Sequence, residues 1–352
     1  ACVRAFRDCS ECRLMEKTAV ILFNLGGPDK LEAVEPFLFN LFYDRAILRL
    51  PKPLRYFLAR LISKKRAPIA REIYAQLGGG SPILPRTQEQ AAALEAELAS
   101  REKDQEYRVF VAMRHWHPMS AETAAEVKIF SPDEIVLLPL YPQFSTTTSA
   151  SSLAEWEKAA TKAKIEAPTY AVCCYPAAAG FCWVVAKLLR EILKKEGEQP
   201  RVLFSAHGLP KKIVTAGDPY EWQVSETVRG VVARLDMPEL DWAVCYQSRV
   251  GPLEWIGPSL DDEITRAAED RVPVVIVPIA FVSEHSETLV ELDIQYLEKA
   301  ITQGVPNYAR VATVGSSPDF ISGLAELVVQ ARKRKLILGS ETGARICPKN
   351  FL

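Results

Sequence analysis

The sequence contains only four histidines, and all of them fall at or just beyond the ends of apolar, β-branched runs. They are His115, His117, His207 and His285. An imidazole has an ordinary pKa of about 6.5, so it is largely neutral at physiological pH and can accept a proton. His207 lies in the motif LFSAHGLP, where Gly208 and Pro210 interrupt a strand, so we expect its side chain at a rigid corner. A satisfied structural imidazole is the alternative for any one of the four.

A second group of polar residues lies in SEHSETLVELDIQYLEKA, directly after an apolar run. The pattern predicts a helix with Ser283 as its N-cap and with Glu284, Glu287 and Glu291 on one face, because they are three and four residues apart. The helix dipole favours ionised carboxylates near that end, where they can take protons or hold a cation. A solvated acidic face is the alternative, but the adjacent His285 and the strand end favour a functional site.

Eight apolar runs separated by helix-like stretches predict an α/β fold. They cover residues 19–25, 109–114, 134–141, 170–175, 202–207, 242–248, 272–280 and 311–315. Continuous apolar runs of this kind form parallel strands that are buried on both faces. Because VILFNLGGP is echoed by VLFSAHGLP, and VLLPLYPQFS by VVIVPIAFVS, we expect two doubly wound, Rossmann-like lobes of four strands each that face a central cleft. The predicted boundaries are an N-terminal extension at 1–16, a first lobe at 17–160, a second lobe at 165–335 and a C-terminal tail at 336–352.

Composition limits the classes of function. Lys plus Arg number 43 and Asp plus Glu 44, so bulk charge gives no case for a nucleic-acid partner. No apolar run reaches the roughly 18 to 20 residues that a membrane-spanning helix needs. Eight cysteines without the spacing of a small disulfide scaffold favour free thiols or metal ligands in a reducing cytoplasm. For Cys2, Cys9 and Cys12, in the extension, we expect no role.

The segment 37–66 interleaves large apolar side chains with eight cations and a single acid, Asp44. Such a segment suits a membrane surface or an anionic amphiphile. A plain amphipathic helix with one solvated face explains the pattern almost as well. We predict a cytoplasmic protein. If the segment 37–66 does bind a membrane surface, the protein would make peripheral contact with the inner face of the cell membrane.

Seven motifs, taken together and in this order, resemble those of the ferrochelatases across about residues 17–330. They are NLGGP at 24–28, GGGSPI at 78–83, YPQFS at 141–145, SAHGLP at 205–210, GDPY at 217–220, QSRVGPLEW at 247–255 and FVSEHSETLVELD at 281–293. The resemblance implies two Rossmann-like lobes that enclose a porphyrin cleft. It also implies an enzyme that inserts Fe²⁺ into protoporphyrin IX and releases two protons, which is the final step of heme biosynthesis.

The resemblance implies roles for individual residues as well. His207 would take pyrrole protons or receive the metal, and Glu287 would stand opposite it. Glu284 and Glu291 would continue an acidic path for iron or protons. The positions that match the family's porphyrin contacts are Leu25, Tyr74, Ser81, Arg114, His115, Tyr141, Gln247, Trp255 and His285, with Arg66 near the propionates. We therefore expect His207 and Glu287 to face one another across a porphyrin-sized slot.

The sequence departs from the family at two places. Some ferrochelatases hold a [2Fe–2S] cluster on one cysteine just after the YPQ motif and three near the C-terminus, but here Thr146 stands at the first position and Cys347 is the only cysteine of the tail. We predict no cluster of that type. His115 stands where many relatives have Tyr.

Two alternatives to the main prediction stay open, as does the oligomeric state. One is a related chelatase that acts on coproporphyrin, another tetrapyrrole or another metal, because imidazole and carboxylate ligands also bind zinc and cobalt. The other is a tetrapyrrole carrier without turnover, although the presence of both His207 and Glu287 argues against it.

Overall fold

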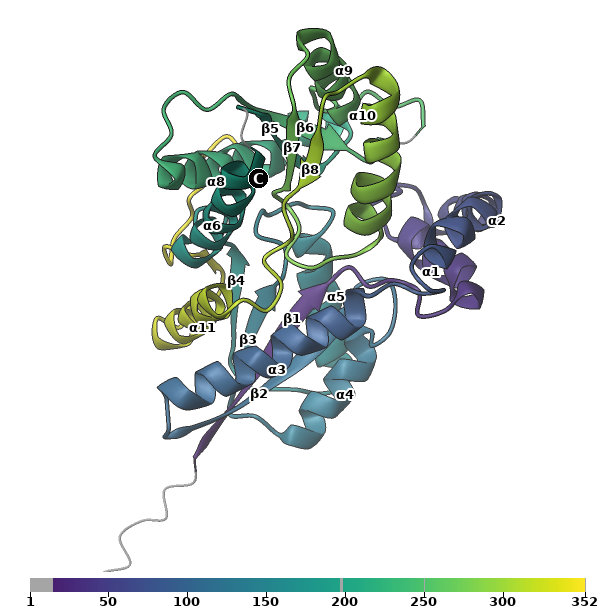
Figure 1. Ribbon diagram of the computed structural model, residues 1–352. Helices are drawn as coiled ribbons and strands as arrows, with labels where there is room; N and C mark the ends of the chain where they lie inside the picture. Colours follow the sequence, from purple (N-terminus) through teal and green to yellow (C-terminus); the bar gives the residue numbers. More distant parts are fainter. Residues whose placement is uncertain (1–14, 197–198, 250, 352) are drawn as a thin grey trace, which may run out of the picture.

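The computed structural model describes residues 15–196, 199–249 and 251–351, and within these ranges two parallel β-sheets lie one above the other (Figure 1). The first sheet has the order β2 (Gln105–Met113), β1 (Glu16–Asn24), β3 (Glu134–Pro139), β4 (Thr169–Cys174) and β9 (Gly339–Ser340). The second sheet has the order β6 (Trp242–Gln247), β5 (Arg201–His207), β7 (Val274–Pro278) and β8 (Tyr308–Arg310). All paired strands are parallel, which confirms the predicted doubly wound α/β fold. Cys2, Cys9 and Cys12 lie outside the described residues.

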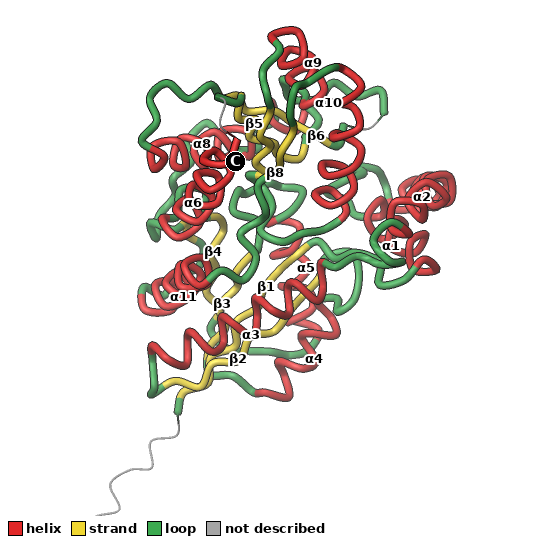
Figure 2. The backbone as a smooth tube through the Cα atoms, viewed as in Figure 1, coloured by secondary structure: helices red, strands yellow, loops and turns green. Residues whose placement is uncertain are grey.

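Helices cover both faces of each sheet (Figure 2). Those around the first sheet are α3 (Ile83–Arg101), α4 (Ser120–Phe130), α5 (Ser149–Lys162) and α11 (Pro318–Lys333). Those around the second are α6 (Ala179–Glu196), α7 (Lys211–Thr215), α8 (Tyr220–Leu235), α9 (Leu260–Asp270), the π-helix η2 (Glu287–Tyr296) and α10 (Leu297–Gln303). A short turn, η1 (Leu31–Ala33), leads to α1 (Val34–Tyr43) and α2 (Lys52–Ala75), which project from one side of the molecule (Figure 1).

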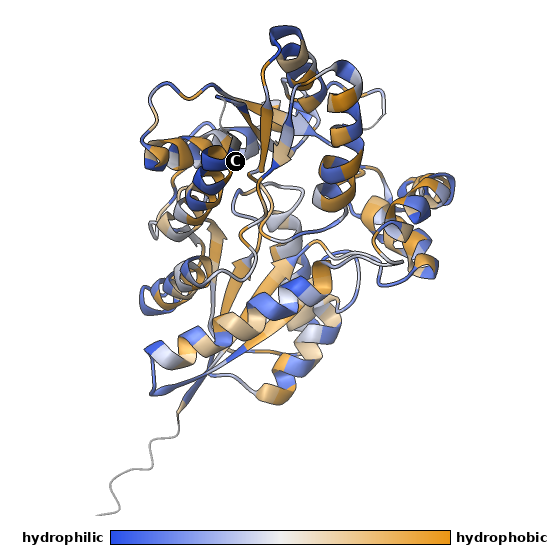
Figure 3. Cartoon of the chain, in the orientation of Figure 1, coloured by the Kyte–Doolittle hydropathy of each residue, from blue (hydrophilic) through white to orange (hydrophobic). Residues whose placement is uncertain are grey.

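The strands form because their residues are apolar on both faces. In β1, Val20 and Leu22 pack in the core that α3 and α11 share, whereas Ile21 and Phe23 pack in a second core with α4 and α5. Successive side chains of a strand point to opposite faces, so a strand between two layers of helices must be apolar throughout. Figure 3 shows the strands as mostly hydrophobic and the helices as mixed.

Both sheets repeat one strand order. The sequence β2-β1-β3-β4 of the first sheet corresponds position by position to β6-β5-β7-β8 of the second. The predicted four strands are found in the second sheet, whereas the first sheet has a fifth strand, β9, from the tail. In sheets of this order, the order reverses between the first and third strands, and ligands bind beyond the carboxyl ends of those strands. The ends of β5 and β7 are therefore the expected place for a site in the second lobe.

The predicted boundary at 160–165 does not coincide with the boundary between the sheets. We assigned the run at 170–175 to the second lobe, but β4 pairs with β3 of the first sheet. The tail returns as well, since β9 pairs with β4, and α11 packs on β3 and β4. The sequence of a buried apolar strand does not show which sheet the strand joins. Its position in the chain therefore predicted the wrong lobe. The eighth run was also displaced, because β8 is Tyr308–Arg310.

A network of buried polar side chains joins the carboxyl ends of the two sheets. Gln143, just after β3, donates hydrogen bonds to the Ile279 carbonyl oxygen after β7 (3.2 Å) and to Thr227 of α8 (2.8 Å). Gln90 of α3 donates to the carbonyl oxygens of Val282 (3.0 Å) and Gly315 (2.8 Å). These contacts fix the loops of one lobe against those of the other.

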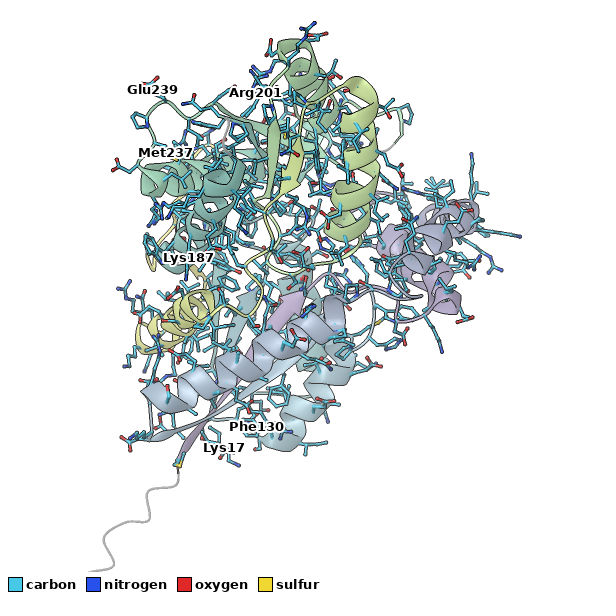
Figure 4. The ribbon with its side chains drawn as sticks, in the orientation of Figure 1. Lys17, Phe130, Lys187, Arg201, Met237 and Glu239 are labelled. Carbon is cyan, nitrogen blue, oxygen red and sulfur yellow. The ribbon has the colours of Figure 1, made fainter. Side chains whose placement is uncertain are left out.

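Asp218 holds the two motifs YPQFS and GDPY together. Its fully buried carboxylate accepts hydrogen bonds from the Ser145 hydroxyl (3.0 Å), the Thr146 amide and hydroxyl (both 2.7 Å) and the Tyr220 amide (3.0 Å). A buried carboxylate is stable only when its oxygens are fully hydrogen-bonded, and these donors supply that requirement. The opposite end of the second sheet is fixed by Arg201, labelled in Figure 4, which binds Asp241 and Asp270 at 2.8 Å each.

None of the helices in the described ranges combines the length and the apolar character needed to cross a bilayer.

Asp218→Ala removes these hydrogen bonds and leaves their donors buried, so we expect the free energy of unfolding to fall by about 3 kcal/mol. Urea denaturation measures this change. Asp104→Ala, at an exposed aspartate of the first lobe, is the matched control and should change stability by less than about 0.5 kcal/mol. Equal effects of the two substitutions would contradict the role given to Asp218.

Candidate active site

His207 and Glu287 are in direct contact at the carboxyl end of the second sheet. His207 is the last residue of β5, Glu287 is the first residue of η2, and His207 Nδ1 lies 2.8 Å from Glu287 Oε2. This is the switch point between β5 and β7. The expected porphyrin-sized slot between the two side chains is absent, because a gap of 2.8 Å admits no atom between them. The pair is one unit that presents both groups together, and it remains partly open, with 40% of the His207 side chain and 22% of the Glu287 side chain exposed.

The backbone after His207 leaves little room for a side chain. A Cβ atom on Gly208 would lie 3.0 Å from the Gln247 carbonyl oxygen and 3.2 Å from the Trp255 ring, which is tighter than most Cβ contacts. The Gly208 amide donates a hydrogen bond to the same Gln247 oxygen at 2.9 Å. Tyr220 of the GDPY motif adds a hydrogen bond to the His207 backbone. These contacts confirm the rigid corner that the sequence predicted.

Glu287 is positioned by a π-helix rather than by the helix that we expected. The N-cap is Ser286 and not Ser283, so Glu284 lies in the preceding loop and does not share a helix face with Glu287. π-Helical turns often occur at functional sites. Sequence spacing alone cannot distinguish a π-helix from an α-helix that starts one turn earlier.

The contact changes the acidity of both partners. Burial favours the neutral imidazole, but the Glu287 carboxylate outweighs it and raises the pKa of His207 above its ordinary value. Burial likewise opposes charge on Glu287, yet His207 and further hydrogen bonds lower its pKa to about 2. The contact therefore stabilises the charged forms of both side chains, the imidazolium and the carboxylate. The ordinary imidazole pKa used in the sequence analysis leaves out this effect of a neighbouring carboxylate.

Ser248 and Gln247 connect Glu287 to Glu291. The Ser248 hydroxyl donates to Glu291 Oε2 at 2.6 Å and lies 3.4 Å from Glu287 Oε2. The Ser248 amide donates to Glu291 Oε1 at 2.8 Å, and the Gln247 amide group donates to Glu291 and to the Glu287 carbonyl oxygen. Burial and repulsion from Glu287 raise the pKa of Glu291. Glu291 is therefore suited to hold a proton close to the pair.

Glu284 and His285 have separate surroundings. Glu284 Oε1 binds Arg310 at 3.0 Å and the Thr313 amide at 2.9 Å. Within the described ranges, no hydrogen bond links Glu284 to Glu287 or Glu291. His285 is buried, its Nδ1 lies 3.0 Å from the Ser283 carbonyl oxygen, and its ring packs against Phe281 at 4.8 Å.

Three residues predicted to contact the macrocycle lie next to the pair. Gln247 is part of its hydrogen-bond network, and Trp255 packs on Gly208. Tyr74 of α2 is buried near Ser286 and Glu287, and burial raises its pKa to about 12 despite a hydrogen bond with Ser286.

Arg114, His115 and Tyr141 gather instead at the carboxyl ends of β2 and β3. Arg114 forms an ion pair with Asp44 (2.8 Å) and donates to Ser151 (2.7 Å). Burial and the charge of Arg114 lower the pKa of His115 to about 3, so this imidazole is neutral and is no base at physiological pH. Burial raises the pKa of Tyr141. No hydrogen bond or ion pair in the described ranges joins this group to His207 or Glu287.

The remaining predicted porphyrin contacts are Leu25, Ser81 and Arg66, and each has its own contacts. The Leu25 carbonyl oxygen accepts from the His115 amide at 2.9 Å. Ser81 packs on Gly27 so closely that a Cβ atom on Gly27 would lie 2.6 Å from the Ser81 side chain. The motifs NLGGP and GGGSPI therefore interlock, which explains their glycines without a phosphate ligand. Arg66 of α2 lies over the Phe42 ring at 5.7 Å.

Comparisons with known proteins show the family to which the chain belongs. The family model described as Ferrochelatase matches residues 17–332. The chain belongs to the ferrochelatase family. It is 50% identical to a ferrochelatase of Pelagibacter ubique over 337 residues, covering 95% of this chain and 97% of that one, and 54% identical to one of Caulobacter vibrioides over 317 residues, covering 90% of each. Among solved structures, SirB from Bacillus subtilis with Fe³⁺ superposes with a TM-score of 0.53 at 13% identity over 91% of this chain and 98% of that one, which is a likeness of fold.

The residues at the place of the cluster that some ferrochelatases hold do not fit it. Thr146, at the position of the first cysteine, uses its hydroxyl to bind Asp218. In the described part of the tail the only thiol is Cys347, whose sulfur accepts from Gln223 at 3.0 Å. No group of three or more metal-binding side chains occurs in the described residues.

The sequence did not single out three residues that organise this ferrochelatase site. Ser248 was only part of the motif QSRVGPLEW and received no role. Asp44 was noted only as the single acid of its segment, and Tyr220 only as part of GDPY. Each acts through a contact distant in sequence, 107 residues away for Asp44 and Ser151, which no local pattern reveals.

We expect an NMR titration to give His207 a pKa above 6.5 in the native protein and a lower one in Glu287→Gln, where the partner charge is lost and burial remains. The raised pKa of His207 stabilises the fold fully below 6.5, and the lowered pKa of Glu287 does so above 4.5. The stability difference between native protein and variant should therefore be greatest between pH 4.5 and 6.5. A His207 pKa that is unchanged in Glu287→Gln would contradict the ion pair.

Proposed function

We propose that this chain inserts ferrous iron into protoporphyrin IX, releasing two protons, and that His207 and Glu287 carry out the reaction. The observation that supports this most directly is their contact of 2.8 Å at the switch point of the second sheet. Metallation replaces two pyrrole N–H protons by one cation, so it needs a base and a charged acceptor side by side. An imidazole and a carboxylate provide nitrogen and oxygen ligands for a divalent ion as well.

The pair determines which nitrogen of His207 meets the substrate. Nδ1 is occupied by Glu287, whereas Nε2 has no hydrogen-bond partner in the described ranges. In the neutral ring, an Nδ1–H bond to Glu287 holds the tautomer whose Nε2 lone pair is free, and when Nε2 takes up a proton the Nδ1 proton can pass to Glu287. That lone pair accepts a pyrrole proton or binds the arriving metal. The porphyrin lies against the open side of the pair, since it cannot lie between the two side chains.

The chain Glu287, Ser248 and Glu291 provides an exit for the protons. The Ser248 hydroxyl touches both carboxylates, so it can accept a proton on one side and donate on the other. The raised pKa of Glu291 makes this carboxylate the better proton acceptor of the two. Glu284 is neutralised by Arg310 and has no part in this route.

Around the macrocycle we assign apolar and aromatic contacts to Leu25, Tyr74, Trp255 and His285. Gln247 holds the pair in place, and Ser81 shapes the adjacent loop. Arg66 is only half-buried and can turn from Phe42 to a propionate. We place Arg114, His115 and Tyr141 on the side of the macrocycle that is away from His207 and Glu287.

An anaerobic assay of iron insertion into protoporphyrin IX tests the reaction. His207→Ala and Glu287→Gln should each lower kcat by about 10²- to 10⁴-fold, because each removes the positioned proton acceptor or its partner. Porphyrin binding, followed by fluorescence quenching, should be retained. His117→Ala is the matched control, since His117 is exposed and pairs only with Glu122. Native protein that binds porphyrin but does not metallate it would be a carrier, and the proposal would be wrong.

We further propose that α2 makes the peripheral membrane contact expected of the segment 37–66. Leu54, Phe57 and Leu61 are 55%, 69% and 65% exposed and lie three and four residues apart, so they form one stripe on the helix. Lys64 and Lys65, both exposed, continue along the same side. Large apolar residues next to lysines suit the interface of an anionic bilayer. A merely solvated helix face would not carry this stripe.

Replacing Leu54, Phe57 and Leu61 by Ser should weaken binding to anionic vesicles at least about 10-fold, because each side chain contributes on the order of 1 kcal/mol when it enters the interface. Cosedimentation with vesicles measures this. Ile129→Ser combined with Ile337→Ser removes equally exposed apolar side chains elsewhere and should leave binding unchanged. Equal binding of the two variants would exclude α2 as the contact.

We place the chain in the cytoplasm. The five cysteines in the described residues are free thiols, including the neighbours Cys173 and Cys174, whose sulfurs lie 3.3 Å apart without a bond. Thiols this close would be vulnerable in an oxidising compartment.

A further inference from the structure

A basic pocket of about 820 Å³ lies between the loop 44–51, the first turn of α2 and the start of α5. Its volume falls in the range of sites for small molecules. Six cationic side chains line it: Arg45, Arg49, Lys52, Arg55, Arg114 and Lys158. Neither His207 nor Glu287 is among its walls. The reaction proposed above makes no use of five of these six cations.

Four of the six cations of this basic pocket have no carboxylate partner in the described ranges. Its single carboxylate, Asp44, is already bound to Arg114 and Ser151. Lys158 has an exposed partner in Glu155. Arg45, Arg49 and Lys52 have no carboxylate within ion-pair distance in the described ranges. Like charges gathered without counter-charges repel one another, and an anion in the pocket would relieve that repulsion.

Arg55 gives the second indication of a ligand. Only 7% of this residue is exposed, its Nη1 donates to the Leu50 carbonyl oxygen at 3.2 Å, and its guanidinium lies over the Tyr43 ring at 5.1 Å. Its Nε is buried without any acceptor. A buried guanidinium without a carboxylate is costly unless another anion compensates it. The structure thus holds a desolvated cation in the wall of a cavity that already has excess positive charge.

We infer that the basic pocket binds a phosphate-bearing anion, either the headgroup of an anionic phospholipid or a soluble phosphate ester. Several guanidinium groups match the many oxygens of a phosphate better than they match a single carboxylate. The lipid source rests on the membrane contact proposed for α2, because Lys52 and Arg55 share a turn with the exposed Leu54. The soluble source does not rest on it.

Two double variants that each remove two positive charges distinguish specific binding in the basic pocket from general electrostatic attraction to an anion. Arg49→Gln/Lys52→Gln changes exposed residues in the pocket, and Lys64→Gln/Lys65→Gln changes exposed residues of α2 outside it. Binding of glycerol 3-phosphate is measured by calorimetry. Binding to vesicles of phosphatidylcholine, with and without one quarter phosphatidylglycerol, is measured by cosedimentation. Thermal denaturation checks that both variants fold.

For a lipid headgroup, the pocket variant should bind the phosphatidylglycerol vesicles at least about 10-fold more weakly than the Lys64/Lys65 variant, which loses only diffuse attraction to the anionic surface. For a soluble ester, the native chain and the Lys64/Lys65 variant should bind glycerol 3-phosphate, the pocket variant should not, and the two variants should bind vesicles equally. If the native protein binds no vesicles, only the membrane contact is refuted, because the measurement with glycerol 3-phosphate still tests the pocket.

Equal vesicle binding by the two variants, with no binding of glycerol 3-phosphate by the native chain, would overturn the inference in favour of diffuse charge. Displacement of bound glycerol 3-phosphate by saturating protoporphyrin IX would overturn it as well, because the pocket would then belong to the porphyrin site.

Discussion

The ion pair between His207 and Glu287 is the contact on which the site depends, because neither charge is stable in this partly buried position without the other. Each partner shifts the pKa of its neighbour toward the charged form against the effect of burial. Removing one partner of such a pair leaves an uncompensated charge, which costs more than the pair itself contributes. The pair therefore requires three elements to lie within hydrogen-bond distance of one another: the end of β5, the end of β6 and the first turn of η2. From β6, Gln247 donates a hydrogen bond to the Glu287 carbonyl oxygen, and Ser248, which follows it, donates one to Glu291.

The two lobes share one strand order but have divided the chemistry between them. At the switch point of the second sheet stand titratable groups that are linked to one another and reach solvent. At the corresponding end of β1 in the first sheet, Asn24 is buried and satisfied by Thr87 and the Leu25 amide. Arg114, His115 and Tyr141 lie nearby, and the neutral His115 cannot relay protons there. We propose that the first lobe provides walls and anchoring groups and that the second provides the acid–base pair.

Much of the fold and the identity of the central pair could be predicted because both depend on local patterns. Continuous apolar runs mark buried strands; His207 ends one of them, and Glu287 lies in the segment that follows another. What could not be predicted depends on tertiary contacts. The run at 170–175 looks like any other strand and gives no sign of joining β3. The raised pKa of His207 follows from a carboxylate 80 residues away. The helix start at Glu287 differs from the expected one by a single turn, and the ion pair of Asp44 with Arg114 joins segments that share no motif.

The path of the chain between the lobes has a consequence for how a flat ligand enters. The polypeptide crosses from the first sheet to the second between β4 and β5 and returns before β9, while Gln90, Gln143 and Asp218 bind across the junction. Rotation of one lobe about a hinge would break all of these buried hydrogen bonds at once. The arm formed by α1 and α2 packs mainly on itself and is attached to the rest by a few polar contacts, such as Asn40 to the His115 carbonyl oxygen. Because these hydrogen bonds hold the two lobes as one frame, we expect any widening of the site to come from displacement of this arm and not from rotation of a lobe.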